Sequence, residues 1–260
     1  MMILFRKWWF YGIISVVSFL FFLFANLPAS FVYQMAKAKI APIQLNGISG
    51  TLWSGRAIQL IYPPVQLDSL QWTIRPKAIL KGKIQGLFYI GNSKQFRIRG
   101  RFDVQDQNHV RFQQITGNTS IPFLTDLLKD FPLQMKGEID LGMDDFMMRA
   151  NGFPEITGRI DIRGLELGPP WKVFLGDVRL LSSMENDMIN IQINDIRSSL
   201  TMNVTLQIWE AGRYRLHGNV EVQSGENKQA MENFLQQSVG LNGNNGHFPL
   251  NMTGTIPFFR

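Results

Sequence analysis

The sequence predicts a mainly β protein that begins with a single transmembrane helix. Residues 8–36 contain no charged side chain, which is typical of a membrane span. In the rest of the chain, apolar residues alternate with polar ones in several short runs. A period of two places the apolar side chains on one face of a sheet. Strands do not alternate with long helical patterns, so a doubly wound α/β fold is not expected.

Residues 8–27 are expected to form the transmembrane helix. They are uncharged and mostly Phe, Ile, Val and Leu. At about 1.5 Å per residue they extend about 30 Å, the thickness of the hydrocarbon core of a bilayer. Arg6 and Lys7 precede them, so the positive-inside rule places residues 1–7 in the cytoplasm and the bulk of the chain across the membrane. Trp8 and Trp9 suit the membrane interface at that edge.

A cleaved signal peptide is the alternative interpretation of this segment. Such a peptide has an apolar run of about 7–15 residues and small residues at positions −3 and −1 of the cleavage site. Cleavage after Ala25 or after Ala29 would place leucine at −3. The sequence therefore favours an uncleaved anchor, with residues 28–42 as a linker and residues 43–260 as one β-rich domain.

Composition excludes several functions. The chain has no cysteine, so it has neither disulfides nor a thiolate metal site nor a cysteine nucleophile. Its net charge is +6, but the basic residues are scattered, with the densest cluster at Arg97–Arg101. A nucleic-acid binder would show a helical or aromatic-interleaved basic patch, so no nucleic-acid partner is expected. A mild positive charge suits anionic lipid or acidic partner surfaces, and also an ordinary solvated surface.

The alternating runs predict antiparallel strands joined by short turns. Turn signals of Gly, Asn and Ser separate the runs. The runs begin and end near Phe96–Val104, Ile189–Ile193, Leu200–Ile208, Leu216–Val222 and Phe248–Met252. The turn signals are Gly91-Asn92, Gly117-Asn118, Asn151-Gly152, Ala211-Gly212 and Ser224-Gly225.

Two segments after the anchor have helical periodicity. In Ile121–Asp130 and in Lys228–Leu241, apolar residues recur on one helical face. Gly240 is available to end the second helix. We expect the apolar faces of both helices to pack in the core, and the alternative is that the helices cover open edges of the sheet.

The sequence offers no set of residues for catalysis. His109, His217 and His247 are far apart and lack metal-ligand spacing. The chain has no G-x-S-x-G elbow and no phosphate-binding glycine loop. Asp144 and Asp145 are adjacent, so on a strand they would point to opposite faces. We therefore expect no enzyme activity, no cofactor and no metal site, and an envelope enzyme has no positive feature in its favour.

Residues 47–60, GISGTLWSGRAIQL, form the most distinctive motif. Gly47, Gly50 and Gly55 allow tight turns and close approach of backbones. Trp53 is expected to pack against these turns, so the motif predicts a hairpin that begins the sheet. A direct contact of Trp53 with a partner protein is the alternative.

This motif resembles the protein N family of the bacterial type II, or general, secretion pathway. A second stretch, residues 70–83, fits the same family and contains Trp72 and Pro76. Gln71 stands where the family usually has serine. The family-like residues of the two stretches, which we expect to have a structural role, are Gly47, Gly50, Thr51, Leu52, Trp53, Ser54, Gly55, Arg56, Trp72 and Pro76.

The resemblance implies a single-pass protein of the bacterial inner membrane, with a cytoplasmic N-terminus and a periplasmic domain. It implies an accessory role in moving folded proteins across the outer membrane, with inner-membrane lipids and other components of the secretion platform as partners. The family's domain is similar to the AsmA-like group, so a curved antiparallel sheet with an open groove and two short helices is expected. The same similarity leaves an alternative open, the binding or transfer of a lipid or another apolar ligand.

Overall fold

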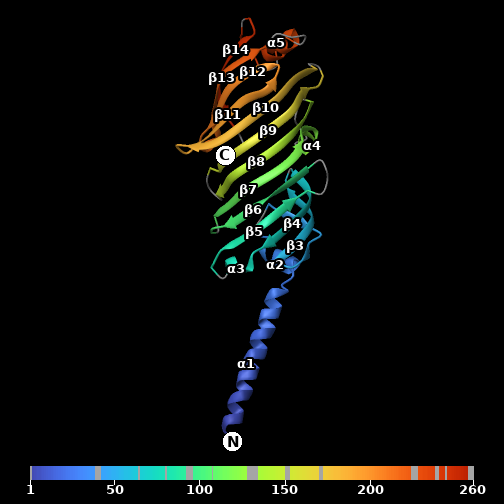
Figure 1. Cartoon of the computed structure of the whole chain (residues 1–260), viewed down its shortest axis with the longest axis vertical. Coiled ribbons are helices and arrows are strands. Elements are labelled where there is room, and N and C mark those ends of the chain that lie inside the picture. Colours follow the sequence, from blue (N-terminus) through green and yellow to red (C-terminus); the bar gives the residue numbers. More distant parts are fainter. Residues whose placement is uncertain are drawn as a thin grey trace.

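The computed structural model describes most of the chain as one helix followed by one long antiparallel sheet (Figure 1). The sheet has 14 strands, and their order in space follows their order in the sequence from β3 to β14. This meander confirms the predicted mainly β class. The described residues are 2–38, 42–63, 65–79, 81–91, 96–106, 108–127, 134–149, 153–169, 172–223, 228–237, 240–243 and 245–256.

The strands lengthen toward the middle of the sheet, and each pairs antiparallel with the next. At the first edge, β1 and β2 both pair with β3. The strands are β1 (Gln44–Asn46), β2 (Ser49–Gly50), β3 (Ser54–Tyr62), β4 (Val65–Ile74), β5 (Ile84–Ile90), β6 (Phe96–Val104), β7 (His109–Ser120), β8 (Met135–Arg149), β9 (Glu155–Leu167), β10 (Val173–Glu185), β11 (Met188–Ser198), β12 (Leu200–Ile208), β13 (Arg213–Val222) and β14 (His247–Thr255).

Helix α1 (Met2–Ala25) stands away from the sheet, and its described side chains are exposed (Figure 1). Its residues Trp8–Ala25 are long and apolar enough to cross a membrane. The helix ends two residues earlier than expected, because Leu27 precedes Pro28 and a residue before proline disfavours the helical conformation. The segment expected as a linker, residues 28–42, contains the short helix α2 (Ala29–Ala36).

The predicted strands near β6, β11, β12, β13 and β14 are confirmed. The turn predicted at Gly117-Asn118 is wrong, because both residues lie inside β7 and pair with β6 and β8. A Cβ atom on Gly117 would lie 2.6 Å from the carbonyl oxygen of Arg97, so this glycine allows close packing of two strands. The turn at Ala211-Gly212 is confirmed within the 3-10 helix η1 (Glu210–Gly212). Residues 92, 151–152 and 224–225 of the remaining turn signals lie outside the described residues.

Both predicted helices are present, and their described parts are shorter than the predicted ranges. Helix α4 spans Ile121–Leu127, and residues 128–130 lie outside the described part. Helix α5 spans Lys228–Gln237. Gly240 then adopts φ +70°, and the backbone N–H of Leu241 donates to the carbonyl of Leu235 at 3.0 Å, so the glycine ends the helix as expected. A further short helix, α3 (Pro76–Ile79), was not predicted.

The strand register gives the sheet one apolar and one polar face. A row of directly paired residues on the apolar face crosses the whole sheet and contains only apolar residues and glycine. It runs Ala57, Leu70, Ile90, Ile98, Gly117, Leu141, Ile160, Leu180, Ile193, Val204, Gly218 and Leu250. The neighbouring row, one residue along each strand, points to the other face. It includes Arg56, Gln71, Tyr89, Arg99, Thr116, Arg159, Gln192, Thr205, His217 and Asn251.

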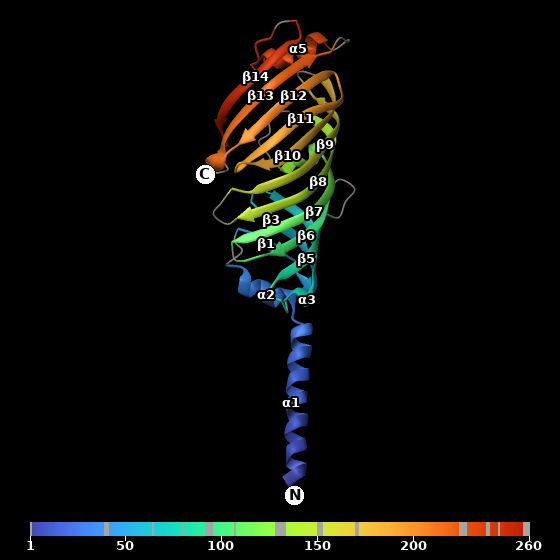
Figure 2. The ribbon, with the colours of Figure 1, turned by 60° about the vertical axis from the view of Figure 1, so that its left-hand side comes forward.

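The best-packed core lies at the end of the sheet farthest from α1 (Figures 1 and 2). There α5 places Met231, Phe234 and Leu235 against apolar residues of β12, β13 and β14. Met231 is fully buried, and burying such a side chain stabilises a fold by about 1.5–3 kcal/mol. Helix α4 packs nearer the middle, where the ring of Phe123 stacks on Phe96 with centroids 5.1 Å apart. The two helices thus cover parts of the apolar face.

Candidate functional site: the membrane-helix junction and the two faces of the sheet

The GISGTLWSG motif forms the expected hairpin at the start of the sheet. Ser49 pairs with Arg56, and Gly50 pairs with Gly55. The backbone N–H of Thr51 donates to the carbonyl of Ser54 at 2.9 Å and closes the turn. Gly50 has φ +86°, a conformation that glycine adopts readily and that β-branched or bulky residues rarely adopt.

The tip of this hairpin binds the C-terminal end of α1, the candidate membrane helix. The indole Nε1–H of Trp53 donates to the carbonyl oxygen of Phe24 at 2.9 Å, and the two rings meet edge to face with centroids 4.7 Å apart. The backbone N–H of Leu52 donates to the carbonyl of Leu27 at 2.8 Å. The last carbonyls of a helix lack partners within it, so these two bonds stabilise the C-terminal end of α1 and the turn after it.

The ring that covers Gly55 of the hairpin belongs to Trp72. A Cβ atom on Gly55 would collide with Cζ2 of Trp72, and Nε1 of Trp72 donates to the carbonyl of Leu52 at 3.0 Å. We expected Trp53 to pack against the glycine turns, but its indole lies against Phe24 of α1, and the ring over Gly55 is that of Trp72. Since Phe24 and Trp53 are far apart in the sequence, no local pattern indicated their contact.

The other predicted motif residues lie around this junction. Gly47, with φ +65°, forms the turn between β1 and β2. The Nε–H of Arg56 donates to the hydroxyl of Ser49 at 3.0 Å. Pro76 is the first residue of α3. Trp8 and Trp9 are 80% and 77% exposed on α1, far from the hairpin, and the side chains of Arg6 and Lys7 lie outside the described part.

The apolar face carries a row of aromatic rings that helices do not bury completely. Phe88 meets Phe112 edge to face at 5.7 Å, and Phe112 stacks on Phe146 at 5.9 Å. All three rings are half-buried. Phe88 also lies over Gly100, where a Cβ atom would come within 2.9 Å of the ring. The arrangement leaves a continuous, partly exposed apolar surface along the middle strands, of the kind that binds an apolar partner.

The polar face is joined by ion pairs between neighbouring strands. Arg111 binds Asp145 through two hydrogen bonds of 2.7 Å. Arg179 binds Asp161 at 2.6 Å, and this hydrogen bond lowers the pKa of the Asp161 carboxyl. Further pairs between strands join Arg149 to Glu155 and Arg163 to Asp140, whereas Arg159 binds Asp161 within β9. Such pairs fix the register of the long middle strands.

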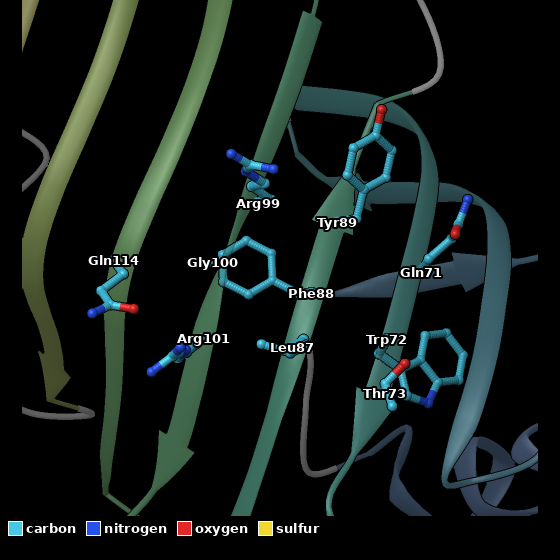
Figure 3. A pocket seen from close by; sticks show the side chains of 10 residues that line it. All are labelled: Gln71, Trp72, Thr73, Leu87, Phe88, Tyr89, Arg99, Gly100, Arg101 and Gln114. Carbon is cyan, nitrogen blue, oxygen red and sulfur yellow. The ribbon is translucent and has the colours of Figure 1, made fainter.

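Two hollows lie side by side over β4 to β8. The first, of about 360 Å³, has walls from Gln71, Thr73, Leu87, Tyr89, Arg99 and Arg101. Figure 3 shows Arg99 and Arg101 on either side of Gly100 in β6, with Leu87 and Tyr89 on the adjacent β5. The second hollow, of about 530 Å³, shares Tyr89 and Arg99 with the first and adds Arg97, Thr116, Asn118 and Asp140.

The described residues contain no group of three or more His, Asp or Glu side chains placed to hold a metal ion. The three histidines are not brought together. His109 contacts Asp106 at 2.8 Å, His247 contacts Glu221 at 3.1 Å, and His217 lies in the polar row of β13. Asp145 of the adjacent acidic pair binds Arg111.

The fold and the junction define a mainly β protein with one candidate transmembrane helix at its N-terminus. The sequence matches the family described as "Type II secretion system (T2SS), protein N" over residues 41–251. Because this match covers most of the chain, the protein belongs to the type II secretion system protein N family. The resemblance found in the sequence is thereby confirmed, and the chain is a component of a type II secretion system.

Two relatives named "Type II secretion system protein N" are similar along nearly their whole length. The one from Aeromonas hydrophila is 26% identical over 249 residues, which cover 93% of this chain and 96% of the relative. The one from Vibrio cholerae serotype O1 is 21% identical over 236 residues, which cover 86% of this chain and 92% of the relative. No solved structure matches this chain significantly.

Proposed function

We propose that this protein is an accessory inner-membrane component of the type II secretion machinery. In this role it supports the export of folded proteins from the periplasm across the outer membrane. Its α1 crosses the inner membrane once, with residues 1–7 in the cytoplasm and the sheet in the periplasm. Other components of the inner-membrane platform and the surrounding lipids are its partners. The role is one of binding and positioning and needs no catalytic step.

The family match over residues 41–251 is the observation that carries this proposal. The junction supports it, because it joins the membrane helix to the sheet through Trp53 and Leu52. A helix anchored in this way holds the sheet close to the membrane surface. There the sheet can meet other parts of a membrane-bound machine.

Deletion of the gene in its native host tests this role. We expect a secreted substrate of the system to accumulate in the periplasm and to decrease in the medium, and the wild-type gene on a plasmid should restore secretion. A variant lacking residues 2–38 and exported by a cleavable signal peptide should restore it less well. Undiminished secretion in the deletion strain would contradict the proposal.

A second candidate function is the binding of a lipid or another apolar ligand on the apolar face. The row of Phe88, Phe112 and Phe146 favours it, because these rings are half-buried and lie on a surface of side chains that continues across the strands. A single-layer sheet with such a face gains stability when an apolar molecule covers it.

Native mass spectrometry of the detergent-extracted protein tests the second candidate. We expect co-purified lipid on the wild type and its loss in Phe112→Gln, which places an amide in the middle of the row. Gln192→Ala, on the polar face, is the control and should retain the lipid. Protein free of lipid in every preparation would argue against this function.

A further inference from the structure

Strand β6 carries a row of arginines on the polar face of the sheet. Arg97, Arg99 and Arg101 alternate with Ile98 and Gly100, so their side chains project to the same side. All three are exposed. Alternate residues of a strand are about 6.6–6.8 Å apart, so the three positive charges form a straight line along β6.

The neighbours of this row do not neutralise it. On β7, the residues paired with the arginines are Asn118, Thr116 and Gln113. On β5, Tyr89 pairs with Arg99 and Leu87 pairs with Arg101. In the described part of the chain, no carboxylate oxygen lies within 4.0 Å of these three guanidinium groups. Among the residues that the structure describes, the side chains of the row make one hydrogen bond, from the Nε–H of Arg99 to the hydroxyl of Thr116 at 3.1 Å.

The nearest carboxylate, Asp103, follows Arg101 on the same face of β6 and accepts a hydrogen bond of 2.9 Å from the amide of Gln85. The nearest carboxylates on β8 bind other arginines. Asp140 lies one strand beyond Asn118 and binds Arg163, and Asp145 lies one strand beyond Gln113 and binds Arg111. The ion pairs of β7 to β10 thus contrast with the unpaired row on β6. Guanidinium groups form strong bidentate bonds with carboxylates, so the row is suited to receive acidic groups from another molecule.

The surface around the row has the composition of a protein interface. The two hollows that flank Arg99 add the phenol of Tyr89, the apolar Leu87, which is 45% exposed, and the amides of Gln71 and Gln114. Arginine and tyrosine are enriched at the centres of protein interfaces. A lipid surface would instead meet the lysines of the α3 turn, Lys77, Lys81 and Lys83, because α3 lies closer than β6 to the end of α1 in both views (Figures 1 and 2).

We propose that the arginine row of β6, formed by Arg97, Arg99 and Arg101, binds an extended acidic segment of a partner protein. An extended chain places its own alternate side chains about 6.6–6.8 Å apart, the same spacing as the arginines. Three carboxylates at alternate positions therefore match the row one to one. Leu87 and Tyr89 lie beside the row on β5, so they contact the face of the bound segment that carries the carboxylates. This binding does not depend on the role in secretion, so the two proposals can fail separately.

A fluorescent peptide of alternating Glu and Thr is the probe, and its binding to the full-length protein in neutral lipid nanodiscs is measured by anisotropy. We expect binding to weaken as ionic strength rises from about 0.01 M to about 0.15 M, because the Debye length shortens from about 30 Å to about 8 Å. The variant Arg97→Gln/Arg99→Gln/Arg101→Gln should bind about tenfold more weakly, the sum of three exposed ion pairs. A peptide with Gln in place of Glu should not bind.

The control variant Arg159→Gln/Arg213→Gln/Arg215→Gln removes the same charge from β9 and β13 and should bind the acidic peptide like the wild type. A charge-reversed variant, Arg99→Glu/Arg101→Glu, should lose the acidic peptide and gain an alternating Lys and Thr peptide, a result that misfolding cannot produce. Equal peptide affinity of the wild type and the β6 triple variant would overturn the proposal. So would a triple variant that loses binding only to phosphatidylglycerol vesicles, since the row would then recognise lipid.

Discussion

The indole N–H of Trp53 donates a hydrogen bond of 2.9 Å to the carbonyl oxygen of Phe24, and the ring of Phe24 packs edge to face against the indole. One residue lies in the last turn of the membrane helix and the other at the tip of the first hairpin of the sheet. The most distinctive motif of the chain therefore joins the candidate membrane anchor to the β-domain. We infer that the motif sets how the sheet stands on the membrane.

The first prediction concerns this bond. Trp53→Phe keeps an aromatic ring but removes the donor, so we expect it to lower the free energy of unfolding by about 0.5–1.5 kcal/mol. Trp53→Ala also removes the ring contact and should lower the free energy of unfolding by about 2–4 kcal/mol. Thermal unfolding of the full-length protein in nanodiscs measures both. Trp209→Phe is the matched control, because the indole N–H of Trp209 has no partner among the described residues.

A secretion assay on the same variants separates the two roles of Trp53. If the residue is structural, as proposed, secretion and unfolding temperature should decrease together. A Trp53→Ala protein that unfolds like the wild type and yet fails to support secretion would identify Trp53 as a contact for a partner.

The second prediction concerns the glycine beneath the aromatic row. A methyl group on Gly100 would lie 2.9 Å from the ring of Phe88, so Gly100→Ala should destabilise the sheet by about 1–3 kcal/mol. Gly142→Ala is the control, since its methyl group would meet its nearest neighbour at 3.9 Å. Denaturant unfolding compares the two. The double variant Gly100→Ala/Phe88→Leu should recover part of the lost unfolding free energy. If the losses of the two single variants simply add, the two side chains do not collide.

The third prediction is a pH dependence that arises from Asp161. The hydrogen bond from Arg179 lowers the pKa of this carboxyl in the folded protein below its unfolded value of about 3.9. The pair therefore stabilises the fold fully above about pH 3.9, and the contribution disappears as the pH falls through the folded pKa. Asp161→Asn should be less stable than the wild type at pH 7, and the difference should vanish in acid.

Unfolding temperatures measured between neutral and acidic pH test this dependence. The control is Asp144→Asn, which removes an exposed carboxylate that has no ion-pair partner in the described chain. If the unfolding temperatures of Asp161→Asn and the wild type differ by the same amount at every pH, the Arg179–Asp161 pair is not the cause of the difference.

The fourth prediction concerns topology. A reporter fused after Arg260 should be active in the periplasm, because the positive-inside rule predicts that the flank with Arg6 and Lys7 stays in the cytoplasm. Intact-mass analysis should find residues 1–25 in the mature protein, since both candidate cleavage sites have leucine at −3. A reporter active only in the cytoplasm, or a mass that begins at Asn26, would contradict the anchor.

Periodicity and composition were sufficient to predict the class of fold. The alternating runs located β6 and β11 to β14, and helical periodicity located α4 and α5. These predictions succeeded because alternation and amphipathicity are local properties, set by which side chains a strand or helix must bury. The turn at Gly117-Asn118 failed because glycine serves both turns and closely packed strands, and only the neighbouring strands decide between them.

The sites required the tertiary structure. The motif around Trp53 was recognisable in the sequence, but its partner Phe24 was not, because a contact between a helix end and a distant hairpin leaves no periodic signal. The arginine cluster of β6 was visible as Arg97–Arg101. The register of β5 to β9 was needed to show that the neighbours of the cluster on β5 and β7 are uncharged and that Asp140 and Asp145 on β8 bind other arginines. Local sequence thus sets which face each side chain occupies, whereas strand register decides which charges meet and which remain unpaired.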